Sequence, residues 1–270
     1  MLKKVKYGNP MYYNKITDDF VITKRHIDTK IDQNYSYNYI TPLNRAIARS
    51  FYYIIIIPIL RIFGFFKGIK VNGRENVKHI KTGYVIYCNH SNNIDAFLGH
   101  TFVARPRETY IIANKDAVCI SRGMRGFIRG LGCLPVPETV KATVNLERFI
   151  KKLLVDNKKV LMITPEAHIW PYYTGFRPVP VTSFKWVAKY DVPAVPVAVK
   201  YRYPKGLFKN RKKPRMTINI GKPIMAPSGL DYREKAQFYH DRVSQYIKLK
   251  VSESDNVAFY KYMKKTKKND

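Results

Sequence analysis

Residues 84–95 read YVIYCNHSNNID, and this stretch decides the predicted fold. Its first five residues, 84–88, are apolar and of strand length, which predicts a buried strand. The polar turn NHSNNID separates this strand from 96–104 (AFLGHTFVA), which is predicted as a helix. A strand, a polar turn and a helix in this order favour an α/β protein, in which loops at strand ends carry the active site.

Strand-like and helical segments alternate along the rest of the chain. The predicted strands lie at 69–77, 108–114, 159–165, 192–203 and 215–221, and the predicted helices at 123–132, 139–157, 182–190 and 231–250. In the helix at 139–157, Leu146, Phe149 and Leu153 share one face. The sequence therefore predicts an α/β fold with a mixed, largely parallel sheet covered by helices, preceded by an N-terminal interfacial membrane helix.

The composition divides the chain into four regions. They are a polar N-terminal arm (1–40), a membrane-interface helical segment (41–68), one main folded domain (69–250) and a basic C-terminal tail (251–270). A single main domain suits a chain of 270 residues, which can bury a substantial core. The arm is rich in Tyr, Asn and Lys and weakly periodic, which predicts at most short structure.

The most apolar segment is FYYIIIIPILRIFGFF at 51–66, and Pro58 and Arg61 interrupt it. A membrane span needs about 20 apolar residues, so this run is too short. A bent helix in the bilayer interface, with basic residues at its polar margins, fits better. These margin residues are Arg45, Arg49, Arg61 and Lys67. A buried core helix is the alternative, because length alone does not separate the two.

The charge of the chain points to a polyanionic partner. There are 49 Lys and Arg against 19 Asp and Glu, a net charge of +30, and residues 200–215 alone carry eight cations. Nucleic acid and anionic lipid are the two candidate partners. Solvated loops can account for any single basic run, but they do not account for the total charge of all the runs together.

Cysteine usage favours a reducing compartment. Cys88, Cys119 and Cys133 form neither a complete disulfide framework nor a metal-binding spacing, so no metal site is predicted. The N-terminus has no apolar run behind its lysines and lacks the pattern of a secretory signal. We therefore expect the protein to remain in the cytoplasm.

His90 and Asp95 are the candidate catalytic residues. On a regular helix a separation of five residues would place them about 140° apart, but a strand–turn–helix corner can bring them together. Asp95 would then accept a hydrogen bond from one imidazole nitrogen and leave the other free to take a proton, as in a general base. The HxxxxD pattern alone occurs by chance in many proteins, so the surrounding sequence must show whether it is a catalytic motif.

That context resembles the glycerolipid acyltransferase family, of the 1-acyl-glycerol-3-phosphate acyltransferase type. Ordered matches cover residues 69–250, which the resemblance identifies as the acyltransferase catalytic domain. They are IKVNGRENV, the NHxxxxD block at Asn89–Asp95, RGLGCLPVPE, TPEAHIW, VPAVPV and IGKPI. An ordered set of this kind is far more specific than any one of its members.

The resemblance implies direct acyl transfer without a cofactor. His90 would deprotonate a lipid hydroxyl, which attacks a fatty acyl thioester carried by coenzyme A or acyl carrier protein. The chain has no GxSxG motif, which agrees with a mechanism lacking a covalent enzyme intermediate. Backbone N–H groups near residues 91–95 are the expected donors to the developing oxyanion.

The same resemblance supplies the expected substrate-binding residues: Asn89, Ser91, Glu166, His168 and Arg177. Glu166 follows an apolar strand and should emerge beside His90, where it would bind or position the acceptor; a surface carboxylate capping a turn is the alternative. Trp170, Tyr172 and Tyr173 would line an acyl or headgroup pocket or form a plain interfacial aromatic cluster.

The sequence departs from the family where arginines usually hold a phosphate. Glu138 occupies that position in the second block and Ile169 in the third, and nearby cations could replace the missing arginines. These cations are Arg129, Lys141, Arg177 and Lys185. We therefore expect an acceptor other than simple lysophosphatidate, such as a glycolipid or another lysolipid.

The expected partners are an anionic membrane surface, the acyl thioester donor (acyl carrier protein among the carriers) and a lysolipid acceptor. The expected location is the cytoplasmic face of a membrane, with peripheral or monotopic attachment. Two other functions stay open: a basic nucleic-acid-binding protein and a non-catalytic lipid-binding member of the family. The basic runs lack a zinc finger, an RNP motif and a helix-turn-helix, so we expect no nucleic acid partner.

Overall fold

The computed structural model describes residues 7–21, 28–37, 42–119, 126, 128–206 and 209–265. The strands are β1 (Asn9–Tyr13), β2 (Lys70–Asn72), β3 (Tyr84–Cys88), β4 (Thr109–Ala113), β5 (Cys133–Pro135), β6 (Val160–Ile163), β7 (Ala194–Arg202), β8 (Arg215–Ile220) and β9 (Tyr260–Lys264). The α-helices are α1 (Pro42–Phe51), α2 (Ile57–Lys67), α3 (Glu75–Lys78), α5 (Val140–Lys151), α6 (Lys185–Tyr190) and α7 (Tyr232–Val251). Shorter 3-10 or π-helical segments occupy Tyr52–Ile56, Asn93–Phe97, Gly99–Val103, Lys115–Val118, Lys152–Asp156 and Val181–Phe184. The helix predicted at 123–132 falls partly outside the described residues; of this range, 126 and 128–132 are described, and 126 and 128–130 are helical.

Seven strands form the central sheet in the order β2-β8-β7-β3-β6-β4-β5. The five strands from β7 to β5 run parallel to one another. β8 pairs antiparallel with β7, and β2 runs parallel to β8. The predicted mixed, largely parallel sheet is therefore confirmed.

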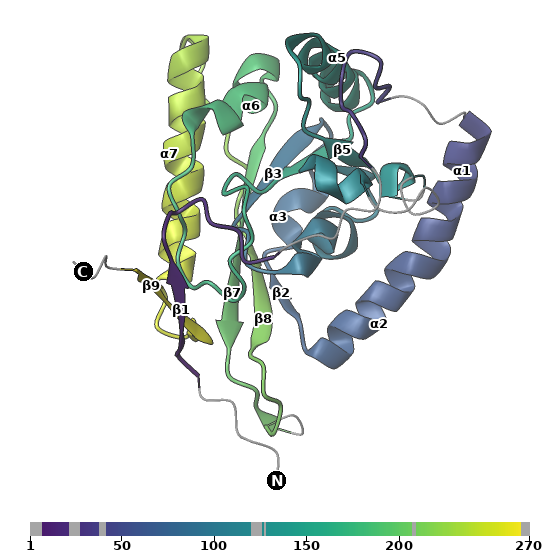
Figure 1. Ribbon diagram of the computed structural model, residues 1–270. Helices are drawn as coiled ribbons and strands as arrows, with labels where there is room; N and C mark the ends of the chain where they lie inside the picture. Colours follow the sequence, from purple (N-terminus) through teal and green to yellow (C-terminus); the bar gives the residue numbers. More distant parts are fainter. Residues whose placement is uncertain are drawn as a thin grey trace.

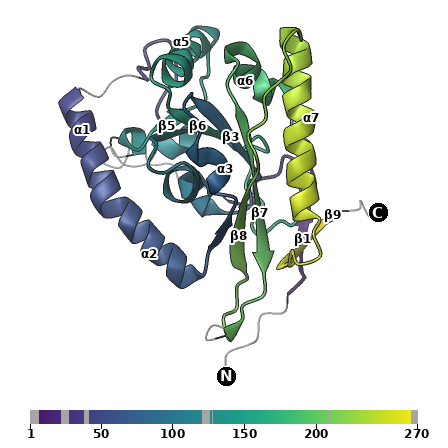
Figure 2. The same cartoon turned by 180° about the vertical axis from the view of Figure 1, so that it is seen from behind.

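Alternate residues of β3 point into two hydrophobic cores on opposite faces of this sheet. Val85 and Tyr87 belong to the core covered by α5, α6 and α7. Tyr84, Ile86 and Cys88 belong to the core covered by α3 and the segment after the NHxxxxD turn. Figures 1 and 2 show the sheet between these two layers. Because both faces are covered, β3 is apolar throughout, which is why its sequence identified it as a strand.

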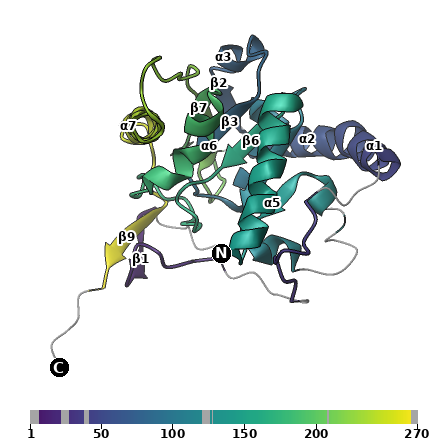
Figure 3. The same ribbon diagram turned by 90° about the horizontal axis from the view of Figure 1, so that it is seen from above.

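One long helix, formed by α1, the π-helical turn Tyr52–Ile56 and α2, lies on the side of the molecule away from α7 (Figures 1 and 3). The widened turn directly precedes Pro58, whose ring and missing N–H disturb regular helical bonding. Within this helix the 19 residues Arg49–Lys67 are long and apolar enough to cross a membrane, by length and composition. The prediction that the segment is too short was wrong, because the helix begins before the apolar run.

This helix packs one face against the catalytic domain and leaves the other exposed. Ile57 is fully buried, Arg49 pairs with Glu108 at 3.0 Å, and a Cβ added at Gly64 would lie 2.6 Å from Phe102. Only 17% of the apolar window is buried, so the alternative of a buried core helix is wrong. Within Arg49–Lys67 the most exposed apolar side chains are Phe65 (76%), Ile54 (72%), Ile62 (57%), Ile59 (55%) and Phe66 (55%). A row of this kind is typical of a membrane-contacting surface.

The two ends of the chain meet in a second, small sheet. β1 pairs in parallel with β9, from Asn9 opposite Tyr260 to Tyr13 opposite Lys264 (Figure 3). Trp170 stacks against Tyr262 of β9 with ring centroids 4.7 Å apart, and its indole N–H donates to the Asp18 carbonyl. The segment that carries the third family block is therefore covered by part of the predicted polar arm and by part of the predicted basic tail.

Candidate active site

The turn after β3 brings His90 and Asp95 together, as predicted. Asn92 caps the 3-10 helix Asn93–Phe97, its side chain accepting from the Ile94 backbone N–H, while the Asp95 side chain accepts from the backbone N–H of Asn92. This reciprocal cap turns the Asp95 carboxylate back over the loop. The Asp95 Oδ2 atom lies 3.3 Å from His90 Nδ1. An ionised carboxylate can only accept, so Nδ1 carries the proton and Nε2 keeps the lone pair that a general base needs.

Asp95 also organises the backbone of the turn. Its Oδ2 atom accepts hydrogen bonds from the backbone N–H groups of Ser91 and Asn92, each at 2.7 Å. The N–H of Ile94 donates to the Asn92 side chain, and the N–H of Asp95 donates to the Asn92 carbonyl. These four N–H groups already donate hydrogen bonds within the turn. For these four groups, the expectation that they would stabilise an oxyanion is therefore wrong.

Asn89 and Ser91 fix the turn to strand β7. The Asn89 amide donates to the Val199 carbonyl at 2.9 Å and accepts from the Val199 N–H at 2.7 Å, which extends the contact of β3 with β7. The Ser91 hydroxyl lies 2.8 Å from the Tyr201 hydroxyl. Both side chains are buried, with 1% exposure of each residue. They hold the turn in place, and their expected substrate-binding role has no support in this geometry.

Glu166 and Arg177 form a buried pair behind His90. Glu166 accepts from the backbone N–H of His90 at 2.6 Å and from the backbone N–H of Arg177 at 2.7 Å. The Arg177 guanidinium lies 3.3 Å from Glu166 and also donates to the Ile16 and His168 carbonyls. Burial raises the pKa of Glu166, while Arg177 and the two backbone donors oppose that shift.

The Arg177 side chain, which was predicted to bind substrate, therefore does not reach the site. The side chains of Arg177 and Glu166 are 3% and 1% exposed, and the guanidinium packs over the Trp170 ring at 4.8 Å. Glu166 is not the surface carboxylate of the alternative interpretation either. Its contact with the His90 backbone makes it a positioning residue for the candidate base.

His90 opens into a cleft of about 580 Å³, here called the His90 cleft. Its walls come from the carboxyl ends of four parallel strands: His90 follows β3, Asn114 follows β4, Val136 follows β5 and Thr164 follows β6. This is where an open α/β sheet places its active site, as the sequence predicted. The volume suits a substrate of drug size or a segment of a longer chain.

The lining of the His90 cleft combines apolar and charged residues. Apolar residues that line it are Val21, Ala96, Ile111, Ile112, Ala113, Ala117, Val136, Pro137, Ala167 and Ile169. His168 lines the cleft and has its Nδ1 atom 3.7 Å from the Asp19 carboxylate. Lys115 lines it too and pairs with Glu138. The predicted site residue His168 thus lies beside His90, whereas Trp170, Tyr172 and Tyr173 lie outside the lining.

Lys115, Asp19 and Tyr201 are site residues that the sequence reasoning missed. Lys115 comes directly after the strand predicted at 108–114, so the strand-end rule applied to every strand would have identified it. Asp19 belongs to the N-terminal arm, where no pattern pointed to the site. Tyr201 lies within β7 and reaches the turn through a contact that no local spacing reveals.

The described residues contain no group of three or more His, Cys, Asp or Glu side chains placed to hold a metal ion. Burial raises the pKa of the Cys88 thiol well above its usual range, and the carboxylates of Asp95 and Glu166 raise it further. A thiol in this state is a poor nucleophile. His90 is therefore the group in the cleft best placed to start a reaction.

Comparisons with known proteins bear on the family and the fold of the chain. The family model described as Acyltransferase matches residues 68–200. The chain is also similar to the crystal structure of the 1-acyl-sn-glycerophosphate (LPA) acyltransferase, PlsC, from Thermotoga maritima, with 19% sequence identity and a TM-score of 0.51. That match covers 78% of this chain and 94% of the other, and at this identity it concerns the fold. None of the curated proteins matches the sequence. The acyltransferase family predicted from the sequence is therefore confirmed over residues 68–200, and the chain is an acyltransferase.

Proposed function

We propose that this acyltransferase moves a fatty acyl group from a coenzyme A or acyl-carrier-protein thioester to the hydroxyl of a membrane lipid. The observation that supports it best is the His90–Asp95 contact at 3.3 Å, placed at the wall of a cleft with many apolar lining residues. The cleft can hold both an aliphatic chain and a polar acceptor. Incubation of the purified chain with labelled acyl thioesters and a panel of lysolipids tests the proposal directly.

In the proposed reaction His90 Nε2 takes the proton from the acceptor hydroxyl while the hydroxyl oxygen attacks the thioester carbonyl carbon. The new C–O bond forms, the carbonyl re-forms from the tetrahedral intermediate, and the C–S bond breaks. The departing thiolate takes up the proton that His90 holds, which returns the imidazole to its starting state. Asp95 stabilises the imidazolium between these two proton transfers.

We propose an acceptor other than simple lysophosphatidate, such as a glycolipid or another lysolipid. The described residues that line the His90 cleft include no arginine, and Lys115 is the cation among them. Lys115 is already paired with the Glu138 carboxylate, which occupies the position where the family usually places an arginine. A phosphate would meet that carboxylate at close range, which is unfavourable.

None of the cations expected to replace the missing arginines lines this cleft. Arg177 is buried against Glu166, and Lys185 pairs with Glu147 at 2.7 Å. Arg129 donates to the Ser36 carbonyl and packs over the Tyr35 ring. Lys141 is an exposed residue of α5 outside the lining. The described cleft therefore favours an acceptor whose headgroup lacks a phosphate monoester.

We predict that neutral, sugar-bearing or zwitterionic hydroxyl acceptors are acylated at least about fivefold faster than lysophosphatidate, since one unfavourable charge contact costs on the order of 1 kcal/mol or more. One acyl donor should be used throughout, and product formation followed for each acceptor. Glu138→Gln is the informative variant, because it removes the carboxylate and should raise the relative rate with lysophosphatidate. A clear preference for lysophosphatidate that Lys115→Gln abolishes would contradict the proposal and place the phosphate site at Lys115.

We also propose that the chain attaches to the membrane through the exposed face of the α1–α2 helix and lies in the interface. Because the inner face of this helix packs on the catalytic domain through Ile57 and Gly64, lipid cannot surround it on all sides. The +30 charge would add attraction to an anionic surface. The three buried cysteines form no disulfide, which supports the cytoplasmic face of the membrane.

We predict that the chain binds anionic vesicles through a salt-sensitive and a salt-resistant part. Ile54→Ser/Ile59→Ser/Phe65→Ser should weaken the binding that survives high salt by about tenfold or more, because each exposed apolar side chain gains on the order of 1 kcal/mol in the interface. Vesicle co-sedimentation across a salt series measures both parts.

The matched control for this experiment is Val140→Ser/Leu249→Ser, two exposed apolar residues of α5 and α7, at 83% and 62% exposure. It should leave vesicle binding unchanged. Equal binding to neutral and anionic vesicles would rule out the electrostatic part of the proposal. Stronger binding to DNA than to vesicles at physiological salt would favour the nucleic-acid alternative instead.

A further inference from the structure

A second hollow of about 430 Å³, here called the basic pocket, lies between the end of α2 and the β7–β8 hairpin. It shares no lining residue with the His90 cleft. Asn92 and Ile94 of the NHxxxxD turn line the basic pocket, whereas His90 and Asn93 line the cleft. The catalytic turn therefore forms a wall of both hollows.

The basic pocket is built by contacts between the hairpin and the end of the helix. The Arg202 guanidinium donates to the Gly68 carbonyl at 2.6 Å and to the Met216 carbonyl at 2.7 Å. Gly68 ends α2 in a left-handed conformation with φ of 64°, and a Cβ there would meet Arg215 at 2.4 Å. The left-handed backbone conformation favours glycine at this position, and the Arg215 guanidinium lies close against it. The hairpin is therefore docked against the last turn of α2.

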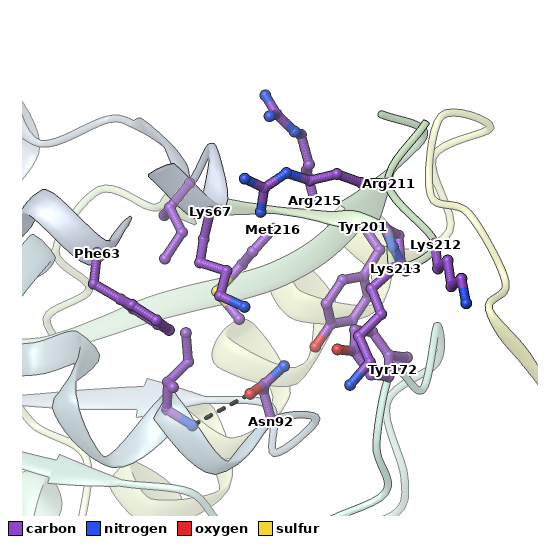
Figure 4. A pocket seen from close by; sticks show the side chains of 13 residues that line it. Phe63, Lys67, Asn92, Tyr172, Tyr201, Arg211, Lys212, Lys213, Arg215 and Met216 are labelled. Carbon is purple, nitrogen blue, oxygen red and sulfur yellow. Dashed lines mark hydrogen bonds between the residues drawn. The ribbon is translucent and has the colours of Figure 1, made fainter. Parts of the chain in front are cut away.

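The charge of the basic pocket is of one sign. Five of its lining residues are cationic: Lys67, Arg211, Lys212, Lys213 and Arg215. No acidic residue occurs among the described residues that line it. Figure 4 shows Lys67 and Lys213 on different sides of the hollow, with Arg211 and Arg215 near its rim. A cluster of like charges around a shared space costs energy unless an anion occupies it.

The rest of the lining is apolar or aromatic. Phe63, Ile69, Ile94 and Met216 line the pocket, and Lys67 Nζ lies 5.0 Å from the centre of the Phe63 ring. Tyr172 and Tyr201 complete the wall, with ring centroids 5.0 Å apart. A small inorganic anion would leave these apolar surfaces unused. A ligand with a phosphate, a polar backbone and the start of an acyl chain would contact both parts.

The position of the basic pocket indicates the source of such a ligand. The pocket lies beside the exposed apolar face of α2, where Phe63 is 44% exposed and Phe66 is 55% exposed. If that face rests in the bilayer interface, the pocket is at the depth of the lipid headgroups. This step rests on the membrane attachment proposed above.

We propose that the basic pocket binds the phosphate-bearing headgroup of an anionic membrane lipid, at a site separate from the acceptor in the His90 cleft. The cations surround the phosphate, and Phe63 and Met216 contact the glycerol and the first acyl carbons. A bound lipid would hold the end of α2 against the hairpin. It would also fix the orientation of the cleft toward the membrane.

The test compares two variants with the same loss of charge in vesicle flotation. Lys67→Gln/Lys213→Gln changes the pocket, whereas Lys205→Gln/Lys209→Gln changes exposed lysines of the same hairpin that do not line it. Vesicles of phosphatidylcholine alone are compared with an equimolar mixture of phosphatidylcholine and phosphatidylglycerol. The pocket variant should bind the anionic vesicles about tenfold or more weakly than the original chain, and the control variant less than about threefold more weakly.

Equal losses in the two variants would show diffuse attraction and overturn the proposal. Thermal unfolding is also measured with these vesicles and with inorganic phosphate at the same phosphate concentration. Vesicles should stabilise the chain and inorganic phosphate should not; equal stabilisation by both would make the ligand a free phosphate and overturn the lipid assignment. If the double variant fails to fold, Lys213→Gln alone is compared with Lys209→Gln.

The binding experiment does not depend on turnover. His90→Ala changes no residue of the basic pocket and should bind anionic vesicles as the original chain does. Absence of acyl transfer with intact, pocket-dependent vesicle binding would contradict the proposed function and leave the headgroup site standing. Normal acyl transfer with equal vesicle binding by both double variants would contradict the headgroup site and leave the proposed function standing.

Discussion

Replacing His90 with alanine is expected to lower the rate of acyl transfer by about 10²–10⁴-fold, the usual contribution of a general base. The loss should appear in kcat with the fold intact, because the polar contact of the His90 side chain among the described residues is with Asp95, while the turn is held by backbone bonds to Asp95 and Glu166. Turnover of a labelled acyl thioester with a lysolipid acceptor measures the rate. Thermal unfolding checks the fold.

His79→Ala is the matched control, since His79 is an exposed histidine at the end of α3 and outside the His90 cleft. It should retain full turnover. Asp95→Asn should also be damaging, because it removes the negative charge that would stabilise the His90 imidazolium. Turnover near the original rate in His90→Ala would refute the general-base mechanism.

The sequence predicted most reliably those elements whose pattern is set by burial within the element itself. β3, β6 and β7 are apolar because helices cover both faces of the sheet, so each appears in the sequence as a continuous apolar run. The His90–Asp95 contact could be predicted because both residues lie in one seven-residue turn. Local patterns of this kind need no knowledge of the rest of the chain.

Contacts between distant segments could not be predicted in the same way. The pairing of β1 with β9 joins residues near opposite ends of the chain, and both strands are partly exposed and rich in Tyr. The length of the α1–α2 helix was missed because the polar residues of α1 continue the helix before the apolar run begins. Neither feature has a local hydrophobic pattern that would reveal it.

The role of Arg177 shows how a site residue can be misread even when its position is right. An arginine near the third block suggested a phosphate contact, since surface arginines often serve this purpose. In the structure, the partner of Arg177 is Glu166, eleven positions away, and the Trp170 ring covers the guanidinium. The arrangement depends on the fold of residues 166–177 and on the cover supplied by β9.

Replacing Arg177 with methionine is expected to destabilise the chain by about 3–5 kcal/mol, because the Glu166 carboxylate would stay buried without its cation. For a chain of this size such a loss corresponds to a drop in unfolding temperature on the order of 10 °C. The control is Lys235→Met, which removes a cation from the pair with Asp191, whose carboxylate is 63% exposed. Exposed pairs contribute about 0–1 kcal/mol, so the control should change the unfolding temperature little.

Glu166→Gln tests whether the pair positions the base as well as stabilising the fold. A glutamine amide has one acceptor oxygen, so it cannot accept from both the His90 and the Arg177 backbone N–H groups, as the carboxylate does. The His90 ring should lose its alignment, which lowers kcat while leaving KM for the acyl donor nearly unchanged. In Glu166→Gln/Arg177→Met both charges are gone, so stability should recover relative to Arg177→Met while kcat stays low. If kcat recovered together with stability, the pair would act only on the fold, and Glu166 would have no separate part in holding His90.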